Sequence, residues 1–324
     1  MGRLLLAPME GLADYLLRDV LTQVGGYDGA VTEFVRASGS LLPHRTYRRI
    51  SPEIDNGGRT SGGTPVVVQL LGSDPAALAE NAARLCELSP PGVDLNFGCP
   101  AKTVNSHGGG AMLLADPECL YRIAGAVRRA VPRHIPFTAK MRLGVEDTSL
   151  ALDCARALEA GGAEGLVVHA RTKRDGYRPP AHWEWIARIR DVVKLPVVAN
   201  GEVWSEDDWR RCRSVSGADD VMLGRGAVSD PFLARRIAAG AEVPADRDAE
   251  WSELLHLIGD FWERVQLKVE ARHAPGRLKQ WINMLRRNFP AAELLYQDLR
   301  AQPECRAVDH VLRRHGVPLL QAAA

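Results

Sequence analysis

The sequence predicts a parallel (β/α)8 TIM barrel followed by a small C-terminal all-helical domain. Eight short apolar runs recur at intervals of about 25–40 residues, and Ala-, Leu- and Arg-rich helical stretches lie between them. Each run is almost continuously apolar, as expected for parallel strands that are buried on both faces. Eight is the number of strands that closes such a barrel. The expected strands are residues 3–7, 30–34, 65–71, 93–97, 137–143, 165–170, 196–200 and 220–223.

A doubly wound open sheet is the structural alternative. Its dinucleotide-binding version carries a G-x-G-x-x-G motif after the first strand, and this sequence has none there. The chain has 324 residues, 46% of them hydrophobic, whereas a β/α barrel alone typically uses about 250. The length therefore leaves room for a second domain.

The segment at residues 239–250 is polar, poor in large apolar side chains, and predicted to be a linker. Beyond it, apolar side chains repeat at the spacing of amphipathic helices. These are Trp251, Leu254, Leu255, Ile258, Phe261, Trp262 and Val265, and then Leu278, Trp281, Ile282 and Leu285. We therefore expect the barrel in residues 1–240 and a small helical domain with its own core in residues 251–324.

The cysteines and the N-terminal residues argue against a disulfide-bonded, metal-binding, secreted or membrane-spanning protein. The six cysteines are scattered, with no C-x-x-C pair and no metal-ligand spacing, which is typical of a reduced cytosolic protein. The apolar run at residues 4–7 ends at Pro8 and is too short for a signal peptide or a membrane span. We expect a cytoplasmic monomer with no metal, membrane or DNA partner.

Charge is distributed unevenly along the chain, although the net charge is only +1. Residues 251–324 carry 11 Lys/Arg and 8 Asp/Glu, and residues 271–290 hold five basic residues and no acidic one. Such a run is often only a solvated face. A cluster of one sign beside a tryptophan also suits a polyanionic partner.

Polar and glycine residues follow the ends of the predicted strands. They lie at residues 8–10, 33–36, 69, 96–99, 140–142, 169–171, 200–202 and 224–226. Because the strands of such a barrel all run in one direction, these residues converge on its C-terminal rim, where barrels place their catalytic groups. This convergence predicts an active site more strongly than any single motif does.

Residues 93–100 are predicted to be a buried strand and a tight turn that presents one thiol, Cys99. Pro100 fixes the backbone after the thiol, and the glycines at 108–110 allow a chain or a phosphate to come close. A thiol with a pKa of about 8.5 is mostly protonated at neutral pH and can act as a general acid. The alternative is that Cys99 is a small buried apolar residue, the common fate of a free cysteine.

A phosphate site is predicted at the ends of the last two strands. Backbone N–H groups of residues 200–202 and 224–226, with the arginine in the second segment, match the usual phosphate site of β/α barrels. The alternative is that these glycines serve only turns. Lys140 can stabilise a negative charge on a reduced flavin, His169 can hydrogen-bond the cofactor, and Gln69 ends a strand near the barrel axis. Together these residues outline a mononucleotide cofactor, FMN.

These motifs resemble those of the tRNA-dihydrouridine synthases over essentially the whole chain. The resemblance rests on Ala7-Pro8-Met9-Glu10-Gly11, Thr32-Glu33-Phe34-Val35-Arg36, Gln69-Leu70-Leu71-Gly72, Asp94-Leu95-Asn96-Phe97-Gly98-Cys99-Pro100, Lys140-Met141-Arg142, His169-Ala170-Arg171-Thr172, Asn200-Gly201 and Gly224-Arg225-Gly226. Within that family the chain resembles the bacterial class that modifies uridine 16 of the D-loop. That narrower assignment rests on residues 32–36, 102–105, 108–110, 176–178 and 277–281.

The resemblance implies an FMN-bearing barrel, a C-terminal tRNA-binding domain and NADPH as electron donor. It implies FMN contacts by Pro8, Met9, Gln69, Lys140, His169, Asn200, Gly201, Glu202, Gly224 and Arg225. It implies that Cys99 is the general acid and that Asn96 lies against the target uracil. The implied tRNA contacts are Arg36, Asn96, Tyr177, Arg277, Lys279 and Arg300. Met284 departs from the pattern, because an aromatic residue is expected there.

The expected reaction reduces the C5–C6 bond of uracil, with a hydride from reduced flavin N5 to C6 and a proton from Cys99 to C5. The base must first leave its stack, which loop bases of tRNA can do. Two rival interpretations remain. An FMN barrel acting on a free pyrimidine-type metabolite keeps the flavin residues and Cys99 but does not need the basic helix. A non-catalytic RNA-binding protein needs the basic helix but has no reason to retain Cys99, Lys140 and the phosphate site together.

Overall fold

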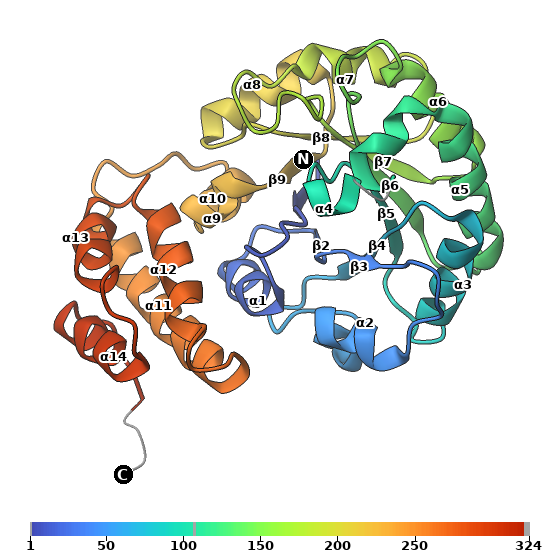
Figure 1. Ribbon diagram of the computed structural model, residues 1–324. Coiled ribbons are helices and arrows are strands. Elements are labelled where there is room, and N and C mark those ends of the chain that lie inside the picture. Colours follow the sequence, from blue (N-terminus) through green and yellow to red (C-terminus); the bar gives the residue numbers. More distant parts are fainter. Residues whose placement is uncertain (1, 106–107, 321–324) are drawn as a thin grey trace.

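A closed barrel of parallel strands forms the centre of the molecule (Figure 1). The computed structural model describes residues 2–105 and 108–320. Neighbouring strands pair in the order β2-β1-β9-β8-β7-β6-β5-β4, and the pairing of β4 with β2 closes the ring, which confirms the predicted TIM barrel. The strands are β1 (Leu4–Leu6), β2 (Gly29–Val31), β4 (Val66–Leu71), β5 (Val93–Phe97), β6 (Phe137–Arg142), β7 (Gly165–His169), β8 (Val197–Asn200) and β9 (Val221–Leu223), with a further short strand, β3 (Val35–Arg36).

The second position of the barrel differs from the single strand predicted at residues 30–34. Strand β2 pairs with the first half of β4, and β3 pairs with its last two residues. Between them, the Thr32 backbone N–H donates to the Val67 carbonyl at 3.0 Å, and the Thr32 hydroxyl accepts from the Gln69 N–H at 3.1 Å. A side-chain hydrogen bond thus replaces one ladder bond and divides the strand in two.

The interior of the barrel is apolar on one side and polar on the other. Successive side chains of a strand point to opposite faces, so every second residue points to the axis. Strands β4, β5 and β6 contribute polar side chains that bond to one another, among them Gln69, Asp94 and Thr138. The apolar side is the small cluster Ala7, Val31, Val167, Val198 and Met222. The polar side forms the floor of the cavity described below.

Helices surround the barrel, as the alternation of patterns predicts. Asp14, Asp74 and Asp116 begin three of them by accepting a backbone N–H of the first turn. The longer helices are α1 (Tyr15–Val24), α2 (His44–Ile50), α3 (Pro75–Cys86), α5 (Pro117–Ala130), α6 (Ala151–Ala160), α7 (Trp183–Arg190), α8 (Glu206–Ser216) and α10 (Leu233–Ala239). Shorter ones are η1 (Pro52–Asn56), α4 (Lys102–Asn105), η2 (Gly110–Ala115) and α9 (Arg225–Ser229).

The C-terminal helices lie beside α1, α9 and α10 (Figure 1). They are α11 (Asp248–Lys268), α12 (Ala274–Leu285), α13 (Pro290–Leu299) and α14 (Cys305–Arg314). The predicted stripe on α12 is buried: Leu278, Trp281, Ile282 and Leu285. The buried apolar residues of these helices and of the helical layer around the barrel form one continuous cluster. The expected separate core is therefore replaced by a shared one.

A buried ion network joins the two parts of the chain. Arg236 of α10 pairs with Glu206, with Asp230 at 2.6 Å and with Glu250 of α11 at 2.7 Å. Arg247 pairs with both Asp230 and Glu250, at 2.9 and 2.5 Å. Because a buried charge that loses its partner is costly, this network fixes the C-terminal helices against the barrel.

Candidate active site

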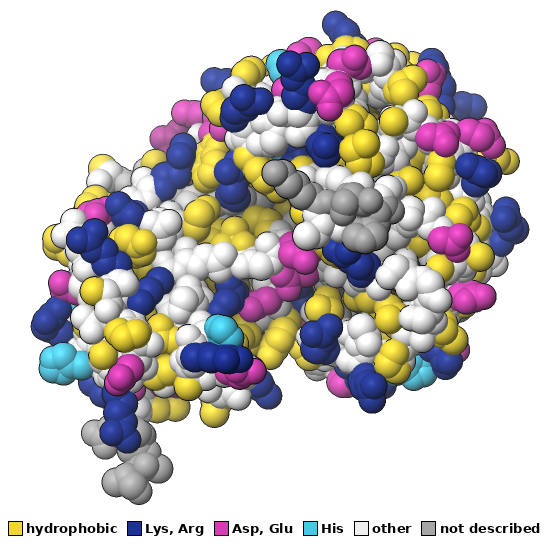
Figure 2. Space-filling model, viewed as in Figure 1, with side chains coloured by type: hydrophobic (Ala, Val, Ile, Leu, Met, Phe, Trp, Pro, Cys, Tyr) yellow, Lys and Arg dark blue, Asp and Glu magenta, His cyan; other side chains and the backbone are white. Residues whose placement is uncertain are grey.

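A cavity of about 590 Å³ opens at the C-terminal ends of the barrel strands. Every predicted catalytic and cofactor residue lines it, and so do Arg36, Asn96 and Tyr177. The predicted convergence of the strand ends is therefore what the structure shows. Lys and Arg side chains lie around the hollow between the barrel and the C-terminal helices (Figure 2).

Cys99 lies in a turn that its neighbours hold rigidly after β5. The Asn96 side-chain oxygen accepts the backbone N–H groups of both Gly98 and Cys99, each at 2.9 Å. The Arg142 guanidinium donates to the Gly98 carbonyl at 2.8 Å. Gly110 has a φ of +60°, and a Cβ there would crowd the Cys99 carbonyl. Burial raises the pKa of the Cys99 thiol, which therefore carries its proton at neutral pH.

The floor of the cavity is a chain of side-chain hydrogen bonds. Gln69 donates to the Asp94 carboxylate at 2.7 Å and accepts from the Asn96 amide at 2.7 Å. Thr138 donates to the second Asp94 oxygen at 2.6 Å. Burial raises the pKa of Asp94 to about 6, against the opposing effects of these hydrogen bonds and of Lys140. Asp94 thus anchors the two amide side chains that face the cavity.

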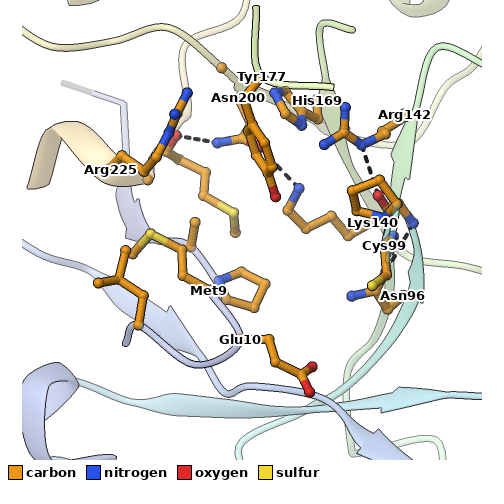
Figure 3. A pocket seen from close by; sticks show the side chains of 18 of the residues that line it. Met9, Glu10, Asn96, Cys99, Lys140, Arg142, His169, Tyr177, Asn200 and Arg225 are labelled. Carbon is orange, nitrogen blue, oxygen red and sulfur yellow. Dashed lines mark hydrogen bonds between the residues drawn. The ribbon is translucent and has the colours of Figure 1, made fainter. Parts of the chain in front are cut away.

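Lys140 lies between the two ends of the cavity (Figure 3). Its ammonium donates to the Asn200 side-chain oxygen at 3.0 Å, and the Asn200 amide donates to the Met222 carbonyl at 2.8 Å. Burial, and then the charge of Arg142, lowers the pKa of Lys140 to about 7. A negative charge in the cavity would raise that pKa again, so Lys140 is suited to face an anionic group.

The two ends of the cavity differ in chemistry. Arg225 lies on one side, Cys99 and Asn96 lie on the opposite side, and Met9 and Glu10 form a further wall (Figure 3). Burial lowers the pKa of His169, and four cationic side chains around it add to the effect, so its ring is neutral at pH 7. The cavity therefore places positive charge at one end and a protonated thiol at the other.

Three predicted tRNA-binding residues lie outside the cavity, on or next to the C-terminal helices. Arg277 pairs with Asp14 at 2.9 Å and donates to the carbonyls of Gly11 and Leu12, each at 3.3 Å. The Lys279 ammonium donates to two backbone carbonyls after α13, and burial lowers its pKa. Both side chains are thus engaged within the chain. Arg277 reaches the turn after β1, where α12 docks, and Lys279 reaches the segment after α13. Arg300 is exposed.

The dihydrouridine synthase family matches residues 5–313 of this chain. The chain belongs to the dihydrouridine synthase family. It is 60% identical over 320 residues to the tRNA-dihydrouridine(16) synthase of Ralstonia nicotianae, covering 98% of each chain. It is 59% identical over 307 residues to the protein of the same name from Aquipseudomonas alcaligenes, covering 95% of this chain and 98% of that one. A solved 2-naphthoyl-CoA reductase, in complex with 2-naphthoyl-CoA, shares the fold with a TM-score of 0.57 at 11% identity, over 74% of this chain and 50% of that one.

The active site of this dihydrouridine synthase also contains residues whose role was not predicted from the sequence. Arg142 donates to the carbonyls of Thr172 and Gly176, and its guanidinium lies 5.2 Å from the Tyr177 ring. Arg171 pairs with Glu202. Both arginines belong to motifs noted in the sequence, but their orientation toward the loop after β7 depends on the folded strands. The position of Asp94 could have been predicted from the sequence, because it lies two residues before Asn96 and therefore on the same face of the strand.

The described part of this dihydrouridine synthase holds no group of three or more His, Cys, Asp or Glu side chains that is arranged to bind a metal ion. Among residues 2–105 and 108–320, no helix combines the length and the apolar character needed to cross a membrane.

Proposed function

We propose that this enzyme reduces the C5–C6 bond of uridine 16 in the D-loop of tRNA, with bound FMN and with NADPH as electron donor. Five relatives that are 57–60% identical to it carry the name tRNA-dihydrouridine(16) synthase. The observation that carries the proposal is the cavity itself. The protonated Cys99 thiol and the buried Lys140 line the same cavity as Arg225 and its neighbouring glycines.

The residues present fit FMN. Gly201 and Gly224 line the cavity without side chains. The space beside Gly224 is open, because a Cβ built there would have no atom closer than 3.9 Å. The backbone N–H groups of both glycines and the Arg225 guanidinium suit a phosphate. Lys140, with its lowered pKa, suits the part of a flavin that becomes negative on reduction. When bound, FMN supplies the hydride for C6 of the base.

Cys99 donates the proton in this reaction. Its S–H bond breaks as the new C5–H bond of the base forms, and the thiolate then recovers a proton from water. Burial raises the pKa of Cys99, so the thiol is the resting form and the recovery is favourable. Asn96 fixes the turn through two backbone N–H groups, and this holds the sulfur in one place while the base is bound.

We propose that residues 1–240 carry the reaction and that residues 251–324 help to hold tRNA over the cavity. Within the cavity, Arg36, Asn96 and Tyr177 are the proposed contacts of the D-loop, and Arg300 is an exposed one outside it. For Arg277 and Lys279 we propose a role in the fold instead, since two hydrogen bonds from each side chain go to backbone carbonyls of the chain. Stacking on Tyr177 suits a base that has left its own stack.

Reconstitution tests this function. The purified protein should be yellow, release about one FMN per chain, and form dihydrouridine in unmodified tRNA when NADPH is added. Free uridine and free uracil serve as the control substrates and should not be reduced. A colourless protein that FMN cannot reconstitute would contradict the proposal, and so would equal reduction of the free base.

A further inference from the structure

The mouth of the cavity carries alternating guanidinium groups and aromatic rings. The Arg225 guanidinium carbon lies 4.7 Å from the centroid of the Tyr177 ring and 5.1 Å from that of Trp204. The Arg287 guanidinium carbon lies 4.1 Å from the same Trp204 centroid. These distances are in the range of cation–π contacts. The stack leads from the cavity to Arg287, which follows the end of α12.

The acid beside this stack, Glu202, has both of its oxygens bonded to other donors. One oxygen of Glu202 accepts from Arg171, and the other accepts from the Trp204 indole N–H at 3.0 Å. Within residues 2–105 and 108–320, no acidic side chain forms an ion pair with Arg225 or Arg287. Burial lowers the pKa of Arg225, the charge of Glu202 opposes this shift, and the charges of Arg171 and Arg287 add to it. Two guanidinium groups therefore flank one indole ring, and neither forms a direct ion pair with Glu202.

The position of this pair is fixed by both parts of the chain. A Cβ at Gly226 would overlap the Val203 carbonyl, so a glycine is needed for the loop after β8 to meet the start of α9. Asn288 donates to the Ser229 carbonyl at 3.0 Å, which ties the residue after Arg287 to the end of α9. The exposed Arg287 side chain is thus held beside the indole rather than free in solvent.

We propose that Trp204 and Arg287 form a phosphate-binding site at the rim of the cavity, next to the proposed FMN phosphate position at Arg225. A guanidinium group presents planar pairs of N–H donors that match phosphate oxygens, and the indole keeps Arg287 oriented. This inference rests on the proposed function, which supplies two phosphate-bearing molecules that enter the cavity. One is tRNA, through the phosphates of its backbone. The other is NADPH, which carries a 2′-phosphate that NADH does not have.

Arg287→Ala tests the site, and Arg286→Ala is its matched control. Arg286 is the adjacent residue with the same charge, but it pairs with Glu293 at 2.5 Å and lies against Tyr296 on α13. Arg287→Lys keeps the charge without the planar donors, so it should recover only part of the loss. Arg287 is exposed, so both of its variants should fold, which a thermal melt verifies.

Two measurements on the FMN-loaded protein distinguish the two phosphate sources. In the first, tRNA binding is followed against salt. If the ligand is a tRNA phosphate, Arg287→Ala should bind about tenfold more weakly and its salt slope should fall by about one unit. In the second, flavin reduction is followed at varied NADPH and NADH. If the ligand is the 2′-phosphate, the apparent Kd for NADPH should rise about tenfold while that for NADH stays unchanged.

Either result supports the site and names its ligand. If Arg287→Ala equals Arg286→Ala in both measurements, the site does not exist and the stack only orders the rim. The outcome is separable from that of the proposed function. A wild-type protein that makes dihydrouridine while both variants behave alike overturns this inference alone. A wild-type protein that binds no FMN or makes no dihydrouridine overturns the proposed function.

Discussion

Among single residues, the proposed proton donor and the cationic side chains lie apart within one cavity. Cys99 lies at one end in a turn fixed by Asn96, and Arg225 lies at the other, with Lys140 between them (Figure 3). Burial shifts two pKa values in opposite directions: it raises that of the Cys99 thiol and lowers that of the Lys140 ammonium. The thiol stays protonated, and the lysine becomes sensitive to any charge brought close to it.

Replacement of the thiol tests its role in catalysis. Cys99→Ala should bind FMN and accept hydride from NADPH but reduce tRNA about 10²–10⁴-fold more slowly, because a general acid contributes that much. Single-turnover formation of dihydrouridine measures the loss. Cys119→Ala is the control, since this partly exposed cysteine lies on α5 outside the cavity. Equal rates for the two variants would show that Cys99 only packs.

The buried lysine makes the stability of the FMN-free protein depend on pH. Its pKa is about 7 in the folded state against 10.5 in the unfolded state, so the unfolded chain binds more protons between these values. The free energy of unfolding should therefore rise with pH in that window. Asp94 has the opposite effect between pH 3.8 and about 6, where the folded protein binds more protons and stability falls as pH rises.

Urea denaturation between pH 7 and 10 measures the lysine effect. Lys140→Met should flatten the rise, whereas Lys194→Met, at an exposed position, should leave it intact. FMN binding should also take up protons near pH 8 in the wild type, since a bound anion raises the pKa of Lys140. A rise that survives in Lys140→Met would mean that another group carries it.

At the scale of elements, helix α12 supports the wall of the cavity rather than presenting a free basic face. Gln280 donates to the Gly11 carbonyl at 2.8 Å, and Arg277 reaches the same carbonyl and Asp14. The N–H groups of Leu12 and Ala13 donate back to the Met9 carbonyl, within the same turn. The helix therefore acts on the cavity through this turn.

Arg277→Ala should therefore loosen the Met9 wall. FMN should dissociate about fivefold faster, as the loss of about 1 kcal/mol of hydrogen bonding implies, with little change in the salt dependence of tRNA binding. Stopped-flow measurement of FMN release gives the rate. Arg272→Ala is the control, because that side chain is 73% exposed and pairs only with Glu270 in the described chain. A normal release rate together with a lower salt slope would restore Arg277 as a tRNA contact.

The strand and helix pattern was predictable because burial repeats along the sequence. Continuous apolar runs place β5 at residues 93–97, and the spacing on α12 places Trp281 and Leu285 in the core. The division of the second strand was not predictable, since it depends on a hydrogen bond between Thr32 and Gln69, far apart in sequence. The partners of Arg277 were hidden for the same reason, because they depend on how α12 docks.

At the scale of the whole molecule, the ion network around Arg236 fixes the C-terminal helices and thereby the shape of the cavity mouth. The sequence shows the charges but not their burial, since both signs are scattered through α8, α10 and α11. Neighbouring Arg235 reaches α11 as well, through Glu253 at 2.8 Å, but both side chains are more than 40% exposed. Helix α10 thus makes a buried ion pair with α11 through Arg236 and an exposed one through Arg235, so the two can be compared.

Arg236→Met should lower the free energy of unfolding by about 3–5 kcal/mol, because it leaves buried carboxylates without a partner. Arg235→Ala should cost less than about 1 kcal/mol, since exposed pairs contribute little. Urea denaturation of the two variants measures both values. Similar losses in both would mean that water reaches the Arg236 network.

The proposed function is tested most directly by a map of dihydrouridine, position by position, in tRNA from a strain that lacks this gene. The map should lose dihydrouridine at position 16 and keep it elsewhere in the D-loop. The wild-type gene should restore position 16, and the Cys99→Ala gene should not, although its protein binds FMN. Dihydrouridine that persists at position 16 in the deletion strain, or that Cys99→Ala restores in full, would show that this cavity does not reduce uridine 16 with Cys99 as its acid.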